Sequence, residues 1–148
     1  MPTLSDDEID RRIATAPVAR LATVDERGHP HVVPIVFALH DARLWSPIDG
    51  KPKRSSALQR VANVRANPRV SLLIDRYDDD WRALWWIRID GDACIVAAGD
   101  LARDELASIE GALRGKYPQY RSVPLFRDAP RLLCITPRAR HAWRASAI

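Results

Sequence analysis

The sequence has no long hydrophobic run and almost no cysteine. No apolar stretch among its 148 residues approaches the ~18 residues of a membrane helix, so no transmembrane segment is predicted. The chain begins with acidic and polar residues, unlike a signal peptide, and we expect a soluble cytoplasmic protein. The two cysteines, Cys94 and Cys134, each lie in an apolar run, which favours two buried, reduced thiols over a disulfide.

Motifs of self-sufficient catalysis are absent as well. G-x-S-x-G, G-x-G-x-x-G and C-x-x-C do not occur, and no nucleophile with its base is apparent. His29 and His31 form an H-x-H pair without a cysteine or carboxylate cluster at metal-binding spacing. The aspartates within residues 75–80 lack the glycine and distal glutamate of a calcium loop. We therefore predict no metal site, and an enzyme with this sequence would depend on a cofactor.

The composition fits one globular domain that spans residues 1–148. Apolar residues make up 47% of the chain, and this length is typical of a single domain. A net charge of +4 permits an anionic ligand without demanding nucleic acid. Nucleic-acid binding is disfavoured further because no aromatic platform is interleaved with the basic residues.

Periodicity predicts a mostly β fold with peripheral helices, arranged as a small antiparallel barrel. A capping box at Ser5 and Glu8 begins the first helix. A second helix is predicted from about Ser56 to Ala66, and a third has Asp100 as its N-cap and Gly115 as its end. Residues 18–48 contain three strand-like segments, the middle one spanning residues 32–39, and three more strands lie within residues 70–75, 83–97 and 131–144.

Two residues mark irregular points in these strands. Pro34 has no N–H to donate, so it marks a sheet edge, a bulge or a position that faces a ligand. Both faces of its strand are apolar, and we expect both to be covered. Gly91 lies partway along the segment of residues 83–97 and predicts a bend or a β-bulge there.

The segment of residues 50–69, "GKPKRSSALQRVANVRANPR", is rich in Lys and Arg and contains no acidic residue. Lys51, Lys53 and Arg54 precede the predicted helix, and Ser55 and Ser56 add hydroxyl groups at its N-terminus. Unpaired N–H groups and the helix dipole favour anions at such a position. The segment predicts a phosphate or carboxylate site, with a solvated basic turn as the alternative.

Tryptophans cluster between residues 81 and 86. Trp85 and Trp86 are adjacent in a predicted strand, so they point to opposite faces of the sheet. One of them can enter the core, and the other must face a partner subunit, a ligand or solvent. Packing in the core or at an interface is one interpretation, and a stacking wall for a planar ring is the other.

The strings "ARLATVDERGHPHVVPIVFAL", "LWSPIDGKPKR" and "RVANVRANPRVSLLIDRYDDDW", together with "LRGKYPQYR", occur in a characteristic order. Across roughly residues 15 to 140 the chain resembles the pyridoxamine 5'-phosphate oxidase-like family with its FMN-binding split β-barrel. It resembles more closely the actinobacterial branch that uses the deazaflavin coenzyme F-420. The resemblance implies a homodimer with two cofactor sites at the subunit interface. It does not identify which residues are catalytic.

The resemblance also implies which residues bind the cofactor. Lys53 and Arg54 would hold the phosphate of the cofactor tail, with Lys51 in support. The residues expected near the ring are Val33, Pro34 and Ile35 along it, Ser46 and Pro47 near its polar edge, and Trp86 from the other subunit.

The resulting functional hypothesis is a coenzyme F-420-dependent oxidoreductase. It would transfer a hydride between the reduced cofactor and an unsaturated or quinone-like small molecule. An FMN-binding oxidase or reductase of the same family is one alternative, and a non-catalytic flavin or deazaflavin carrier is another. The chain lacks a recognisable C-terminal Arg and His pattern for binding pyridoxamine phosphate, so that oxidase activity is not implied.

Overall fold

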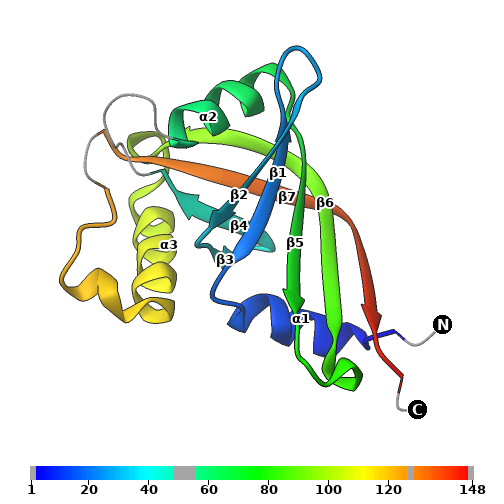
Figure 1. Cartoon of the computed structure of the whole chain (residues 1–148). Coiled ribbons are helices and arrows are strands. Elements are labelled where there is room, and N and C mark those ends of the chain that lie inside the picture. The colour runs from blue at the N-terminus through cyan, green and yellow to red at the C-terminus, as the bar shows by residue number, and fades with distance from the viewer. Residues whose placement is uncertain (1–2, 49–55, 127–128, 147–148) are drawn as a thin grey trace.

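One antiparallel sheet of seven strands dominates the computed structural model, which describes residues 3–48, 56–126 and 129–146 (Figure 1). The strand order is β2-β1-β5-β6-β7-β4-β3. The strands are β1 (Ala19–Val24), β2 (Pro30–Ile35), β3 (Ala38–His40), β4 (Arg43–Pro47), β5 (Arg69–Arg76), β6 (Trp85–Ala97) and β7 (Arg131–Arg144). The α-helices are α1 (Asp6–Thr15), α2 (Ser56–Ala66) and α3 (Arg103–Lys116), and short 3-10 helices are η1 (Trp81–Ala83), η2 (Ala98–Asp100) and η3 (Pro118–Arg121). The prediction of a mostly β fold with peripheral helices is confirmed.

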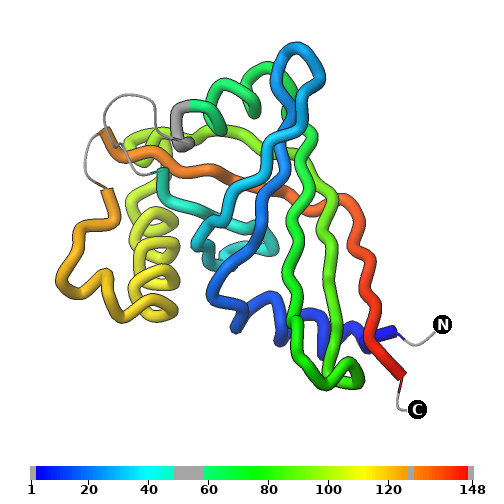
Figure 2. The backbone as a smooth tube through the Cα atoms, in the orientation of Figure 1, coloured from blue at the N-terminus to red at the C-terminus, as the bar shows by residue number. Residues whose placement is uncertain are grey.

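The sheet curls because its two edge strands are consecutive in the chain. β2 and β3 lie at opposite ends of the strand order, yet only Val36 and Phe37 connect them. Such a link spans about 10 Å at most, so the two edges must approach each other. β1 and β2 consequently cross in front of β4 and β7 in the view of Figure 2. The sheet forms a barrel that stays split between β2 and β3.

The single strand predicted over residues 32–39 is wrong, because the chain leaves the sheet at Val36 and Phe37. The Phe37 N–H donates to the Tyr117 hydroxyl at 3.0 Å, and the Phe37 carbonyl accepts a hydrogen bond from Lys116 Nζ at 2.9 Å. Side chains at the end of α3 therefore replace the strand partners of this residue. One predicted strand becomes β2 and β3, which gives seven strands rather than six.

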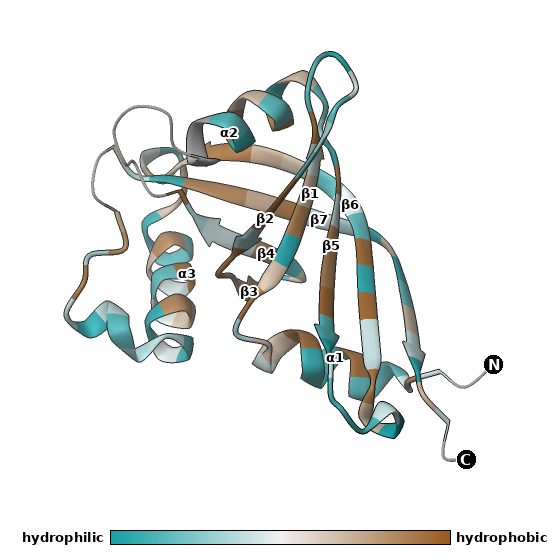
Figure 3. Ribbon diagram, in the orientation of Figure 1, coloured by the Kyte–Doolittle hydropathy of each residue, from teal (hydrophilic) through white to brown (hydrophobic). Residues whose placement is uncertain are grey.

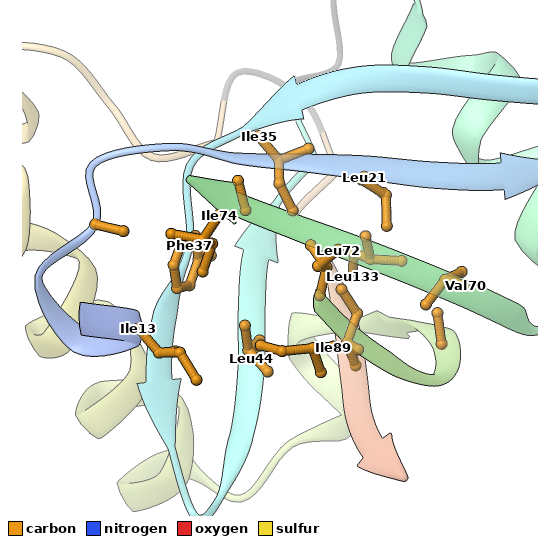
Figure 4. Packing of buried hydrophobic residues seen from close by; sticks show 14 of the residues in the cluster. Ile13, Leu21, Ile35, Phe37, Leu44, Val70, Leu72, Ile74, Ile89 and Leu133 are labelled. Carbon is orange, nitrogen blue, oxygen red and sulfur yellow. The ribbon is translucent and has the colours of Figure 1, made fainter. Parts of the chain in front are cut away.

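Two groups of buried side chains fill the interior. The barrel core takes the inward positions of β1, β5 and β6, and the alternating hydropathy of β6 is visible in Figure 3. Ile13 of α1 closes the barrel, and Figure 4 shows its side chain directed into the same interior as Phe37, Leu44 and Ile89. A second group lies beneath α3 and contains Trp45, Ile109, Leu113, Leu132 and Cys134.

The start of α1, the bounds of α2 and the irregular point in β6 can be compared directly with their predictions. Ser5 and Glu8 form the predicted capping box: the Ser5 hydroxyl accepts from Glu8 N at 3.3 Å, and Ser5 N donates to the Glu8 carboxylate at 2.9 Å. α2 spans the predicted residues. The β6–β7 register shifts between Asp90 and Gly91, where Arg138 of β7 has no partner, so the predicted bend or bulge corresponds to an irregularity at this point.

The predicted ends of α3 are wrong at both termini. Ala102 is the N-cap, because Asp100 belongs to the preceding 3-10 helix η2. Gly115 lies inside the helix, which ends instead at Lys116 with Tyr117 as its C-cap, directly before Pro118. Proline disfavours helical backbone in the residue that precedes it, and this explains the stop.

The expectation of two buried thiols is wrong for one of the cysteines. Cys94 of β6 and Cys134 of β7 are register partners, and both thiols are free. Cys134 is buried, but Cys94 is exposed. Burial is the main cause that raises the pKa of Cys134 to about 12.

None of the described helices is both long enough and apolar enough to cross a bilayer.

Candidate functional site

A cavity of about 260 Å³ lies between the ends of β2 and β4, helix α2 and the segment that follows α3. It brings together Pro34 and Ile35 of β2 with Ser46 and Pro47 of β4. All four were expected near the cofactor ring. The remaining lining residues are Val36, Arg60, Tyr120, Val123, Pro124 and Leu125.

The cavity forms where the strand pairing stops. β3 pairs with β4 only from Arg43 to Trp45, so Ser46 and Pro47 have a strand partner on the β7 side alone. β2 is an edge strand, which is one of the positions predicted for Pro34. Since the barrel is split between β2 and β3, the free edges of β2 and β4 face a common space. A hollow results whose lining is about equally polar and apolar and includes the buried Ser46.

Arg60 of α2 lines this cavity, and it also lines a small adjoining hollow with Ser46, Pro47 and Val61. The helix that carries it is fixed from inside the protein. The side-chain amide of Asn63, which is 1% exposed, donates to the Thr23 hydroxyl at 3.0 Å. Arg60 was not among the predicted site residues, although it lies within the basic segment of residues 50–69. Its position one turn inside the helix was the available signal.

Lys51, Lys53 and Arg54 lie outside the described residues, as does Ser55. They directly precede α2, the helix from which Arg60 enters the cavity. Their assignment to the cofactor phosphate stays a prediction.

The opposite wall of the cavity comes from the segment after α3. Tyr120 of η3 lines the cavity, and the ring of Tyr117 packs against it edge to face with centroids 6.1 Å apart. The string "LRGKYPQYR" contains both tyrosines but gave no indication that they face β2. That proximity depends on contacts between residues about eighty positions apart.

Val33 and Trp86 do not line this cavity. Val33 packs against the barrel core, on the opposite side of β2 from Pro34. Trp86 lines a separate hollow of about 390 Å³ with Leu73, Tyr77 and Trp143. Within one chain the expected ring residues are therefore only partly brought together.

Trp85 and Trp86 point to opposite faces of the sheet, as predicted. The Arg12 guanidinium of α1 lies 4.6 Å from the ring centroid of Trp85, which packs against the barrel core. Trp86 lies on the other side, on what we call the outer sheet face. This face is defined by Val32, Pro34, Leu73, Trp86 and Trp143.

The outer sheet face is not covered within a single chain. Val32 is 64% exposed and Leu73 is 37% exposed. The expectation that both faces of the strand containing Pro34 are covered therefore requires something outside this chain. The same face also carries the ion pairs Arg20–Asp75 and Arg88–Asp90. Exposed apolar side chains mixed with charged groups in this way are compatible with an interaction surface.

Other clusters of polar residues have local explanations. Among the described residues no group of three or more His, Cys, Asp or Glu side chains could hold a metal ion. The backbone N–H of Asp80 and then the Arg76 side chain lower the pKa of Asp78, and the Arg82 side chain and then its backbone N–H lower the pKa of Asp80. A larger hollow of about 560 Å³ lies between α1, the β3–β4 turn and β7. Its Arg140 and Asp10 are paired with each other, and it contains none of the residues expected at the site.

Comparison with known proteins gives a family match over nearly the whole chain. The family model described as pyridoxamine 5'-phosphate oxidase matches residues 5–144. Among proteins of curated function, no sequence matches this chain.

Solved structures share the fold at low sequence identity. A conserved hypothetical protein of Mycobacterium tuberculosis is 22% identical, with a TM-score of 0.74 over 95% of this chain and 85% of that one. An FAD-binding protein of Mesorhizobium loti is 25% identical, with a TM-score of 0.71 over 99% and 97% of the two chains. The heme storage protein HutZ of Vibrio cholerae is 17% identical, with a TM-score of 0.71 over 94% and 93%. The expected split-barrel architecture is thereby confirmed.

Proposed function

The chain belongs to the pyridoxamine 5'-phosphate oxidase family, and from that premise we propose that it is an oxidoreductase that binds coenzyme F-420 in the cavity between β2, β4 and α2. The observation that carries the proposal is that Pro34, Ile35, Ser46 and Pro47 line one cavity together with Arg60. The resemblance of the sequence to the F-420-dependent branch supports this cofactor over its relatives.

The residues of the cavity fit a flat ring with one polar edge. Pro34, Ile35 and Pro47 offer apolar surface. Ser46, a residue that is only 3% exposed, offers a hydroxyl group. Arg60 offers a cation that suits a phosphate or a ring carbonyl. We propose that Lys53 and Arg54, supported by Lys51, bind the phosphodiester of the tail just before α2.

When bound, the reduced deazaflavin supplies a hydride from its ring carbon to an unsaturated or quinone-like substrate. The chain's own contribution is to orient the ring and to keep water from one side of it. Ile35 and Pro47 are buried and form part of that dry wall. No side chain of the described cavity is assigned as a nucleophile.

The size of the cavity supports a homodimer. A volume of about 260 Å³ lies below the roughly 300–1,000 Å³ of typical ligand pockets, so one chain offers only part of a site. Pro34 lines the cavity and also lies on the outer sheet face, where Leu73 and Trp86 are neighbours across β5 and β6. We propose that a second copy docks on this face and that its Trp86 completes the wall beside the ring.

A flavin is the second candidate cofactor, favoured by the FAD-binding protein of Mesorhizobium loti. Pro34, Ser46 and Arg60 would serve FMN in the same way, because FMN also has a flat ring and a phosphate. Heme fits less well, since the lining residues of the described cavity include no His, Cys or Met to ligate the iron. A carrier without catalysis remains the alternative to an enzyme.

Equilibrium titration of the purified apo-protein with F-420, FMN, FAD and heme tests the cofactor. We expect the tightest binding for F-420, with one site per chain, followed by FMN. Preferential binding of heme, or no binding of any of the four, would reject the proposal. Turnover of reduced F-420 with a panel of enones and quinones then distinguishes an oxidoreductase from a carrier, which would bind the cofactor without consuming it.

A further inference from the structure

Two side chains at the end of α3 form hydrogen bonds with the backbone of the link between β2 and β3. The Phe37 N–H donates to the Tyr117 hydroxyl at 3.0 Å. The Phe37 carbonyl accepts from Lys116 Nζ at 2.9 Å, and the Tyr117 hydroxyl lies within donating distance of it, at 3.1 Å. The same hydroxyl lies 3.0 Å from the carbonyl oxygen of Pro17. We call Lys116 and Tyr117 the α3 clamp.

Lys116 is held in the clamp by the Phe37 carbonyl and by two aromatic rings, and not by a carboxylate. Its Nζ lies 3.6 Å from the ring centroid of Phe37 and 5.3 Å from that of Tyr117, which are cation–π distances. No ion pair joins Lys116 to an acidic side chain in the part of the chain that the structure describes. Burial lowers the pKa of Lys116 to about 8 and raises the pKa of Tyr117. Near neutral pH both groups therefore keep the protons with which they donate.

The clamp connects the two opposite walls of the candidate cofactor cavity. One wall contains Ile35 and Val36, the residues immediately before Phe37. The other wall contains Tyr120, whose ring contacts that of Tyr117. A shift of Tyr117 relative to Phe37 would change the distance between these walls. Phe37 itself is fully buried, so the link cannot adjust by moving into solvent.

We propose that Lys116 and Tyr117 are positioning residues that set the separation of the β2 wall from the η3 wall and thereby the fit of the ring-shaped cofactor. The clamp touches the backbone next to the cavity, and neither of its side chains lines the cavity. This inference rests on the proposed function, because it assigns the cavity to a cofactor. A structural role alone would predict a change in folding stability without a change in the bound state of the ring.

The test uses the full chain with FMN and F-420 as probes and the variants Lys116→Met, Lys116→Arg and Tyr117→Phe. Lys116→Met and Tyr117→Phe each remove a hydrogen bond to Phe37, and we expect about tenfold weaker binding together with a shifted absorption band of the bound ring. Lys116→Arg keeps a cationic donor, and we expect it to restore most of the affinity and the wild-type spectrum. Arg103→Met, at the exposed other end of α3, is the matched control and should bind as the wild type does.

Hydrogen exchange of the Phe37 amide in the apo-protein tests the clamp without any cofactor. We expect exchange at least several-fold faster in Tyr117→Phe than in the wild type, since the amide loses its acceptor. Unchanged exchange, or unchanged affinity and spectrum in both Lys116→Met and Tyr117→Phe, would overturn the inference while leaving the proposed function intact. A wild-type protein that binds neither probe would instead overturn the proposed function, and with it the assignment of the clamp to a cofactor.

Discussion

The effect of a single glycine on stability depends on the space around the position that its Cβ would take. At Gly91, an added Cβ would lie 2.5 Å from the backbone carbonyl oxygen of Thr136 on β7. At Gly111, on α3, nothing lies within 4 Å of the same position. The two glycines therefore have opposite consequences for stability although both lie inside regular elements.

We expect Gly91→Ala to destabilise the protein by about 1–3 kcal/mol, because a backbone atom of β7 must move to accept the methyl group. Gly111→Ala should stabilise it by roughly 0.5–1 kcal/mol, the usual difference in a helix interior. Urea unfolding of both variants measures these changes. An unaltered midpoint for Gly91→Ala would show that the β6–β7 bulge tolerates a side chain.

The basic residues before α2 give a second prediction at this scale. The double variant Lys53→Ala with Arg54→Ala should lose several kcal/mol of cofactor affinity, because each charge-assisted contact to a phosphate contributes about 1.5–3 kcal/mol. Arg65→Ala is the matched control, since Arg65 is an exposed cation of the same basic segment. Calorimetry measures both, and equal binding by the double variant and the control would reject the phosphate assignment.

Among the elements, α2 is held to the barrel by a buried polar contact as well as by apolar packing. Asn63 donates to Thr23 at 3.0 Å and accepts from Gln59 at 2.7 Å, and both Asn63 and Thr23 are 1% exposed. Val61 and Val64 supply the apolar contacts. This attachment fixes the orientation of the helix and therefore the place at which Arg60 reaches the cavity.

We expect Asn63→Ala to destabilise the protein by about 1–3 kcal/mol, because it leaves the buried Thr23 hydroxyl without its donor. It should also weaken cofactor binding by shifting Arg60. Adding Thr23→Val removes the orphaned hydroxyl and should recover part of the stability without recovering the affinity. Urea unfolding and cofactor titration of both variants check this, and full recovery of affinity in the double variant would contradict the role given to α2.

At the scale of the whole molecule, the outer sheet face determines whether the chain can act alone. Leu73 and Leu39 are both 37% exposed, but Leu73 lies on that face and Leu39 lies on the β3–β4 hairpin. We expect the wild type to sediment as a dimer, and Leu73→Arg to sediment as a monomer that has lost most of its cofactor affinity. Leu39→Arg should remain dimeric. A monomeric wild type, or a dimer that survives Leu73→Arg, would contradict the proposed interface.

The pH dependence of stability is also a property of the whole molecule. A lysine whose pKa is lowered in the folded state from 10.5 to about 8 binds fewer protons when folded than when unfolded between these values. Stability contributed by Lys116 should therefore rise with pH across this window. The free energy of unfolding, measured in urea from pH 7.5 to 9.5, should rise more steeply in the wild type than in Lys116→Met. Parallel slopes would show that Lys116 keeps its ordinary pKa.

At acidic pH the stability of the protein depends on carboxyl groups whose pKa values are lowered in the folded state. Hydrogen bonds lower the pKa of Glu8, chiefly through the backbone N–H of Ser5, and that of Asp90, chiefly through the Ser71 hydroxyl. Their contribution is complete above the ordinary carboxyl pKa values of 4.5 and 3.8. It is lost as pH falls through the lower values of the folded state.

The sequence by itself determined those features that depend on residues a few positions apart. Four features follow from local hydrogen bonding, sterics or strand alternation: the capping box at Ser5, the bounds of α2, the irregular β6–β7 pairing beside Gly91, and the opposite faces of Trp85 and Trp86. For the candidate site, Pro34, Ile35, Ser46 and Pro47 were named in advance by resemblance, and the structure places them around one cavity.

Only the tertiary structure decided where the middle strand breaks, which cation enters the cavity and which residues form its far wall. Phe37 leaves the sheet because Tyr117, eighty residues away, binds its N–H. Arg60 and Tyr120 reach the cavity because the sheet curls and brings β2, β4, α2 and η3 together. Such contacts depend on the packing of the whole chain, so they cannot be predicted from a periodicity or motif within a short window of sequence.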